Sequence, residues 1–179
     1  MENVIHNYTG YGTQGENYKP HQDIKEIAKI VKSTLKKEFP DCNFSVQIER
    51  YSGGQSLNIS LMSAPWEAII NTGSIIDRKF VSTSEQGYEF KKHTQLNQYQ
   101  FNNPYEGQTA CADGIPEGWN NGAILTREAW NCMERAYKIA SGYNYDDSDG
   151  MIDYFNTNFY LHLNIGKWDN PFQRKGGKS

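Results

Sequence analysis

The sequence lacks the features that mark secreted, membrane and metal-binding proteins. Its cysteines, Cys42, Cys111 and Cys132, are three in number and far apart, and no C-x-x-C pair occurs. This pattern excludes a disulfide framework and a cysteine-based zinc site. Residues 1–18 contain no apolar signal-peptide run, and no apolar stretch is long enough to span a membrane. These absences predict a cytoplasmic protein with no membrane segment.

The chain also has little excess of either charge, with 18 Lys and Arg against 21 Asp and Glu and a formal net charge of −3. A surface that is basic throughout, as in proteins that coat nucleic acid, is therefore excluded, and so is an acidic disordered tail. What the chain does have is aromatic side chains, 12 Tyr, 8 Phe and 4 Trp, which can build a core despite a hydrophobic content of only 37%. Its 179 residues are enough for one domain.

Hydrophobic periodicity predicts two principal helices. Apolar residues recur at three- and four-residue steps from Gln22 to Phe39, and Pro40 ends this first helix. A second helix is predicted after Thr126, a residue type that suits the N-cap, and it ends at Gly142.

Alternation of apolar and polar residues predicts strands at 44–48, 57–61 and 159–165. The first two form a hairpin with one wet face, and its glycines, Gly53 and Gly54, can both take positive φ. Between residues 63 and 122 the pattern is less regular, with a plausible strand at 88–99 and a loop at 102–122. Trp168 and Phe172 are expected to pin the end of the last strand to the sheet.

This order of elements favours an α+β fold. We expect a mainly antiparallel sheet with the two principal helices packed on one face. The predicted organisation is an irregular N-terminal arm at 1–20, a single α+β domain at 21–173 and a flexible tail at 174–179.

The most concentrated charge is the acidic turn formed by Asp146, Asp147 and Asp149, with Asp153 beyond it. A calcium-binding EF-hand loop does not fit, because its two end positions would lack a carboxylate. The simpler interpretation is that these carboxylates cap the turn or are solvated. A metal-dependent enzyme at this turn, with His162, is a third hypothesis, and we assign no metal, cofactor or catalytic residue. Cys111, in the predicted loop, is the one cysteine worth testing for reactivity.

Two sets of residues are candidates for binding a partner. The lysines on the polar face of the first helix, with an arginine and a tyrosine near the hairpin turn, could contact nucleic acid weakly, although such faces are often merely solvated. Aromatic residues of the arm and the long loop are candidate anchors for a protein partner. The first set is Lys29, Lys32, Lys36, Arg50 and Tyr51, and the second is Tyr8, Tyr11, Tyr18, Tyr105 and Trp119.

Three ordered stretches together resemble a known family. They are the helical segment 27–40, the hairpin 44–60 with its Tyr51-Ser52-Gly53-Gly54 turn, and the segment 143–172 with its acidic turn and a Lys-Trp-Asp-Asn-Pro-Phe run. The chain resembles, over roughly residues 22–172, the large polyvalent protein-associated domain type 29. Such domains occur in phages, conjugative plasmids and integrated elements.

The resemblance implies a biological context and no catalytic residues. Polyvalent proteins are thought to enter the recipient cell with invading DNA and to protect it from host defences. The resemblance therefore implies a non-enzymatic accessory or counter-defence protein, of the kind that includes anti-CRISPR inhibitors. Its partner would be a host defence protein or a protein–nucleic acid complex. The alternative is a nucleic-acid-binding accessory domain that uses the lysine-rich helix.

Overall fold

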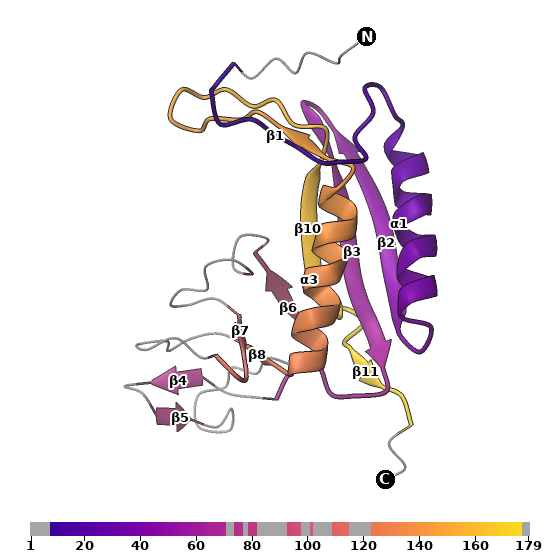
Figure 1. Ribbon diagram of the computed structural model, residues 1–179. Helices are drawn as coiled ribbons and strands as arrows, with labels where there is room; N and C mark the ends of the chain where they lie inside the picture. The colour runs from indigo at the N-terminus through magenta and orange to yellow at the C-terminus, as the bar shows by residue number, and fades with distance from the viewer. Residues whose placement is uncertain are drawn as a thin grey trace.

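A computed structural model describes residues 8–70, 93–97, 101, 109–114 and 123–176, together with the backbone of residues 74–76 and 79–81. Figure 1 shows the arrangement of the helices and strands. In chain order they are β1 (Thr13–Gln14), α1 (Ile24–Glu38), β2 (Asn43–Tyr51), β3 (Gly54–Ala64), β4 (Ser74–Ile76), β5 (Lys79–Val81), β6 (Thr94–Leu96), β7 (Ala110–Cys111), β8 (Ile124–Leu125), α3 (Arg127–Ser141), β9 (Tyr145–Asp146), β10 (Tyr160–Ile165) and β11 (Gln173–Arg174).

Both predicted helices are present, and their ends are set by capping residues. The carboxylate of Asp23 caps α1 by accepting a hydrogen bond from the backbone N–H of Lys25 at 2.8 Å, so the helix begins two residues later than predicted. Thr126 caps α3 as predicted, because its hydroxyl accepts from the backbone N–H of Ala129. Gly142 closes α3 at the predicted residue.

The predicted hairpin is also present, with β2 and β3 paired antiparallel. Of the two hairpin glycines, Gly53 has a positive φ, of 92°, and Gly54 does not, so the expectation is wrong for Gly54. Gly54 is already the first residue of β3, opposite Tyr51. A Cβ at Gly54 would lie 3.1 Å from the Tyr51 ring and 3.3 Å from the Tyr160 ring. Glycine is therefore used here for close approach.

The main sheet is mixed. Its strand order is β11-β3-β10-β6, and a fifth strand, β2, pairs with β3 outside this order. Most of its paired residues are in antiparallel ladders, as predicted, but two of its four strand pairs are parallel. β10 lies parallel to β3 from the Tyr160–Ser56 pair to the Ile165–Leu61 pair, and β11 is also parallel to β3. A parallel neighbour requires a long crossover connection, and α3 lies within the one that links β3 to β10.

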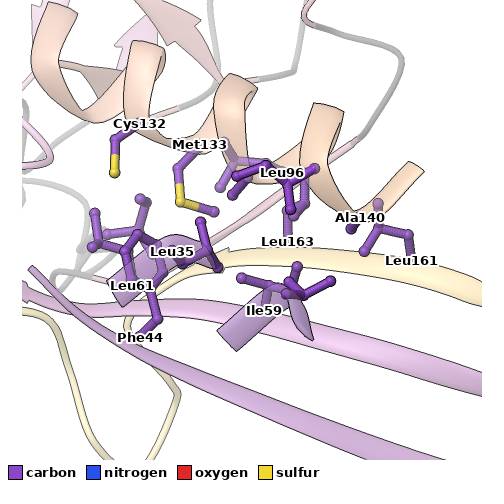
Figure 2. Packing of buried hydrophobic residues seen from close by; sticks show 14 of the residues in the cluster. Leu35, Phe44, Ile59, Leu61, Leu96, Cys132, Met133, Ala140, Leu161 and Leu163 are labelled. Carbon is purple, nitrogen blue, oxygen red and sulfur yellow. The ribbon is translucent and has the colours of Figure 1, made fainter. Parts of the chain in front are cut away.

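One face of this sheet carries the core, and both helices pack on that face as predicted. Figure 2 shows Cys132 and Met133 pointing from α3 toward the strands that carry Ile59, Leu61 and Leu163. The apolar residues of α1 join the same cluster. The fully buried large side chains are Ile24, Ile27, Leu35, Leu57, Ile59, Leu61, Leu125, Met133, Phe159, Leu163, Ile165 and Phe172.

The opposite face of the sheet is polar, as predicted for the hairpin, although Ser56 and Ser60 on its central strand are buried rather than exposed to solvent. Alternation places there Ser45, Gln47 and Glu49 of β2, Ser56, Asn58 and Ser60 of β3, and Tyr160, His162 and Asn164 of β10. His162 lies opposite Asn58, a cross-strand position, so the polar side of β10 is continuous with that of the hairpin.

Of the strand predicted at 88–99, the structure describes residues 93–97, and these include β6. Two other expectations need correction. The predicted loop 102–122 contains β7, which pairs parallel with β8. Phe172 is buried and stacks on Trp66, but Trp168 is 88% exposed because it lies at the tip of a turn closed by two backbone hydrogen bonds between Lys167 and Asn170.

The flexible tail is predicted to begin at residue 174, but the chain is still paired with β3 at that position. Gln173 and Arg174 lie parallel to Ser63 and Ala64 of β3. The backbone N–H of Lys175 then donates to the carbonyl of Ala64 at 2.7 Å. This pairing fixes Lys175 beside the domain.

Candidate binding surfaces

The N-terminal arm lies along the segment that follows α3. β1 pairs antiparallel with β9, and the backbone N–H groups of Gly15 and Asn17 donate to the carbonyls of Asn144 and Gly142 at 2.9 and 2.7 Å. Figure 1 shows the two segments side by side, projecting from the sheet and helices. We call residues 8–18 and 143–159 together the arm lobe.

Close backbone contact at Gly15 explains why a glycine stands there. A Cβ on this residue would lie 2.3 Å from the carbonyl oxygen of Ser141 and 2.4 Å from that of Gly142. No side chain fits in that space unless the backbone moves. The arm can therefore approach the end of α3 only because residue 15 is glycine.

Asp147 anchors the start of the described arm. Its carboxylate is buried and accepts hydrogen bonds from the backbone N–H of Tyr8 at 2.7 Å, from the N–H of Thr9 at 3.2 Å and from the Thr9 hydroxyl. These donors, the Thr9 hydroxyl first, hold the pKa of Asp147 below its ordinary value. Asp147 therefore serves the arm as an ionised acceptor.

The other acidic residues of the turn also have structural roles. Asp149 accepts from the backbone N–H of Met151 at 2.8 Å, and Asp146 accepts from that of Ser148 at 3.1 Å. Asp153 has a φ of 52°, within the tight connection between Asp149 and Tyr154. Within the part of the chain that the structure describes, no group of three or more His, Cys, Asp or Glu residues is placed to hold a metal ion.

Asp146 and His162, both named with the metal hypothesis, line one groove of about 430 Å³ between β6, β10 and the turn. The rest of this lining is neutral, and it includes Asn97, Asn144 and Thr157. Asp147 is absent from the lining because its carboxylate faces the arm. Asp146 and Asp147 are neighbours in the sequence, but in the structure Asp146 lines the groove and Asp147 faces the arm.

The arm lobe carries most of the large exposed apolar side chains of the described residues. They are Met151 at 92% exposure, Tyr11 at 80%, Tyr8 at 71%, Phe155 at 63% and Ile152 at 57%. The lobe contains five carboxylates, counting Glu16, and no Lys or Arg. Its surface is therefore both apolar and acidic.

The tyrosines predicted as partner anchors have different surroundings. Tyr8 is exposed, yet its ring contacts Tyr154 with centroids 4.9 Å apart. Tyr18 is half-buried and stacks on Tyr145, whereas Tyr11 is free of such ring contacts among those the structure describes. The other two anchors, Tyr105 and Trp119, lie outside the described residues.

Sequence reasoning did not identify Met151, Ile152 and Phe155. The available signal was their position, since apolar residues that follow directly on an acidic turn match neither helical nor strand periodicity. Apolar residues outside both patterns do not form the buried face of a helix or strand, and these three side chains are exposed to solvent.

The nucleic-acid set is divided between different surfaces. Lys29, Lys32 and Lys36 are exposed on one side of α1. Arg50 lies on the helix-covered face of β2, where it pairs with Asp23 at 2.9 Å. Tyr51 follows it on the opposite, polar face and stacks on Tyr160, because successive strand residues alternate between faces.

The C-terminal end of α1 borders a second groove, of about 310 Å³. We call it the lysine groove, and it is lined by Lys32, Lys36, Pro40, Cys42, Asn43, Phe44 and Lys175. It brings two of the predicted lysines together with one from the end of the chain.

Cysteine accessibility differs from the sequence expectation. Cys111 is buried, which removes the reason for testing it first. Cys42 is partly exposed, and its thiol interacts with that of the buried Cys132. Burial raises the pKa of both thiols, so neither is activated as a nucleophile.

Together these features define a small α+β protein that carries an aromatic, acidic lobe at one end and a lysine groove at the other. Residues 22–127, more than half of the chain, match the family model described as large polyvalent protein associated domain 29. The chain belongs to this family. No curated protein and no solved structure matches it significantly.

The family match covers two of the three stretches on which the resemblance rests and the region between residues 66 and 122. The third stretch, 143–172, lies outside it, as does the arm. Both segments of the arm lobe are therefore beyond the matched residues. Across the described parts of the chain, no helix is long and apolar enough to cross a membrane.

Proposed function

We propose that this protein is a non-enzymatic accessory protein of a phage or another mobile element. In this proposal it binds and inhibits a host defence complex, such as a CRISPR–Cas complex, in the cytoplasm of the bacterial host cell. Membership of the polyvalent-domain family supports the mobile-element context. The arm lobe, with its exposed apolar side chains on a hydrogen-bonded scaffold, is the observation that carries the binding role.

The arm lobe has the properties of a protein interface. Tyrosine and other aromatic residues are frequent anchors in such interfaces, and Tyr8, Tyr11 and Phe155 of the lobe are exposed. The backbone pairing of β1 with β9 and the hydrogen bonds to Asp147 already join the two segments of the lobe in the free protein. Binding would therefore cost little additional ordering.

The hydrogen bonds made by the acidic turn support a structural rather than a catalytic role for its carboxylates. Asp147 and Asp149 accept hydrogen bonds from backbone N–H groups of their own lobe. Carboxylates used in this way are less available as metal ligands or as general bases. We assign no cofactor and no catalytic residue in this proposal.

A tagged pull-down from bacterial lysate, with and without nuclease and read by mass spectrometry, tests the proposal. We expect a defence protein to be retained after nuclease treatment. The double variant Tyr11→Ala/Phe155→Ala is expected to weaken binding at least about tenfold, as loss of aromatic anchors does. Trp168→Ala is the matched control, because Trp168 is exposed but lies outside the lobe.

Retention of no protein after nuclease, or equal binding by the double variant and the wild type, would contradict the lobe as the docking surface. The pair Tyr105→Ala and Trp119→Ala tests the remaining predicted anchors separately. Each should reduce affinity without changing the midpoint of thermal unfolding, as expected for contact residues.

A second candidate function is contact with nucleic acid through α1. The observation that favours it is the exposure of Lys29, Lys32 and Lys36 along one side of the helix. If this candidate is right, the logarithm of the affinity for nucleic acid falls steeply with the logarithm of the salt concentration. Replacing these lysines should flatten that slope, and a slope near zero in the wild type would exclude the candidate.

A further inference from the structure

We propose that the lysine groove is a binding site for a phosphate group, held by Lys32, Lys36 and Lys175. The inference deepens the nucleic-acid candidate by naming where a backbone phosphate would bind. It does not depend on protein binding by the arm lobe.

The three lysines reach the groove from opposite ends of the sequence. Lys32 and Lys36 are four residues apart on α1, so they lie on neighbouring turns of one helix face. β11 holds Lys175 there, since the Lys175 backbone N–H is bonded to Ala64. The Lys175 ammonium group donates to the carbonyl of Asp41 at 3.2 Å, which places it at the rim of the same hollow.

The lining of the groove contains three cationic side chains and no carboxylate. Glu38, the acidic residue at the end of α1, is held by Arg135 through two hydrogen bonds of 2.7 and 2.8 Å. Its carboxylate is thus directed to α3. Three lysine side chains therefore line one hollow that has no carboxylate in its walls.

Like charges around one hollow repel each other, and an anion between them converts that repulsion into attraction. Lysine is a compact, strongly hydrated cation that binds phosphate as a point charge, so three of them can surround one phosphate without a fixed geometry. A volume of about 310 Å³ is ample for such a group. Polar and apolar walls from Asn43, Phe44 and Pro40 complete the site.

The site differs from the set predicted from sequence. It adds Lys175, which sequence position alone does not connect with α1. It excludes Arg50, which pairs with Asp23, and Tyr51, which lies on the polar face of the sheet. Figure 1 shows that the end of α1 lies beside β11 and far from the arm lobe.

Two probes test the inference on the full chain, inorganic pyrophosphate and a single-stranded oligodeoxythymidine. Pyrophosphate should shift the backbone amide resonances of Cys42, Asn43 and Phe44 in a saturable way. The triple variant K32Q/K36Q/K175Q should lose affinity for both probes by about tenfold or more at low salt. The control K19Q/K25Q/K37Q also removes three positive charges, two of them from α1, but leaves the groove intact, and it should change affinity by no more than about twofold.

Tighter binding of the oligonucleotide than of pyrophosphate assigns the phosphate to a nucleic-acid backbone, whereas equal binding assigns it to a small phosphate compound. Equal losses in the two triple variants would overturn the inference, because they would indicate a diffuse positive surface. Absence of saturable shifts at Cys42, Asn43 and Phe44 would overturn it as well. Unchanged midpoints of thermal unfolding show that each variant is folded.

Discussion

The arm lobe and the lysine-bearing helix differ in charge, in composition and in how they are built. The lobe contains five carboxylates and no basic residue, whereas α1 contains five lysines and two glutamates. A net charge of −3 for the whole chain conceals this separation. Near-neutral composition therefore excludes a uniformly charged surface, but it does not exclude two local surfaces of opposite sign.

The two surfaces also differ in their dependence on long-range contacts. Helical periodicity places the lysines of α1 opposite the core, so their common side follows from local sequence. The arm lobe exists only because residues near the start of the chain hydrogen-bond to residues after α3. A perturbation can therefore disconnect the lobe while α1 stays in place.

The largest effect is expected where both surfaces share a support. Ile59 of β3 is fully buried between Val46 of β2 and Leu163 of β10. Ile59→Ala should lower the free energy of unfolding by about 2–5 kcal/mol, because it leaves a cavity in the core. Chemical denaturation measures the loss, and the lobe and α1 should unfold in one transition.

Ile59→Val is the control for that experiment, with an expected cost of about 0.5–1.5 kcal/mol. Two separate transitions in either variant would contradict the view that one core supports both surfaces.

Gly15→Ala should separate the two surfaces. The added Cβ meets the backbone of Ser141 and Gly142 at under 2.5 Å, so the arm has to move away, at a cost of about 1–3 kcal/mol. Amide exchange should accelerate at Gly15 and Asn17, while pyrophosphate affinity changes by less than about twofold.

Gly10→Ala is the matched control for steric crowding, because a Cβ there meets nothing within 4 Å; its positive φ of 80° adds only local strain. Undiminished protection of the arm in Gly15→Ala would show that the close approach at residue 15 is not required.

Acid should release the arm before it affects the lysine groove. The pKa of Asp147 is lowered in the folded protein, so its contribution to arm docking is complete above the unfolded value of about 3.9 and is lost as the pH falls through the lower folded value. The Thr9 amide resonance should be constant between pH 5 and 7 and move only in stronger acid.

Asp147→Asn should weaken arm docking at neutral pH, since an amide offers one acceptor oxygen in place of a carboxylate. It should also remove the acid-dependent step at Thr9. An acid step of the same size in this variant would assign the titration to another carboxylate.

The smallest effect is expected at the ion pair between Glu38 and Arg135, which joins the end of α1 to α3. Both side chains are partly exposed, so a double-mutant cycle of Glu38→Gln and Arg135→Gln should give a coupling of about 0.2–1 kcal/mol. High salt should reduce it further. A coupling well above this range would show that the pair is more than a surface contact.

Local sequence was sufficient for the main elements and insufficient for the surfaces they form. Asp23 and Thr126 cap helices whose stripes and stops are visible in the chain, and the alternation from Phe44 to Leu61 defines the hairpin. Register and pairing were not readable in the same way. The parallel contact of β10 with β3 depends on a crossover through α3, and neither strand's own sequence encodes it.

The same limit applies to the candidate sites. Lys32 and Lys36 could be placed on one face from their spacing alone, but Lys175 joins them only through the pairing of β11 with β3. Arg50 and Tyr51 are neighbours in sequence and yet face opposite sides of the sheet. The exposed Met151, Ile152 and Phe155 gain significance only from the arm that lies beside them.

By itself, the sequence determined the α+β class, both helices, the hairpin, the last strand and the family, because these follow from periodicity, capping and local motifs. The tertiary structure alone decided that Asp147 would hold the arm and that Lys175 would complete a groove with α1. The physical reason is that hydrogen bonds and charges act between atoms close in space, and residues 138 positions apart become neighbours only after the core has formed.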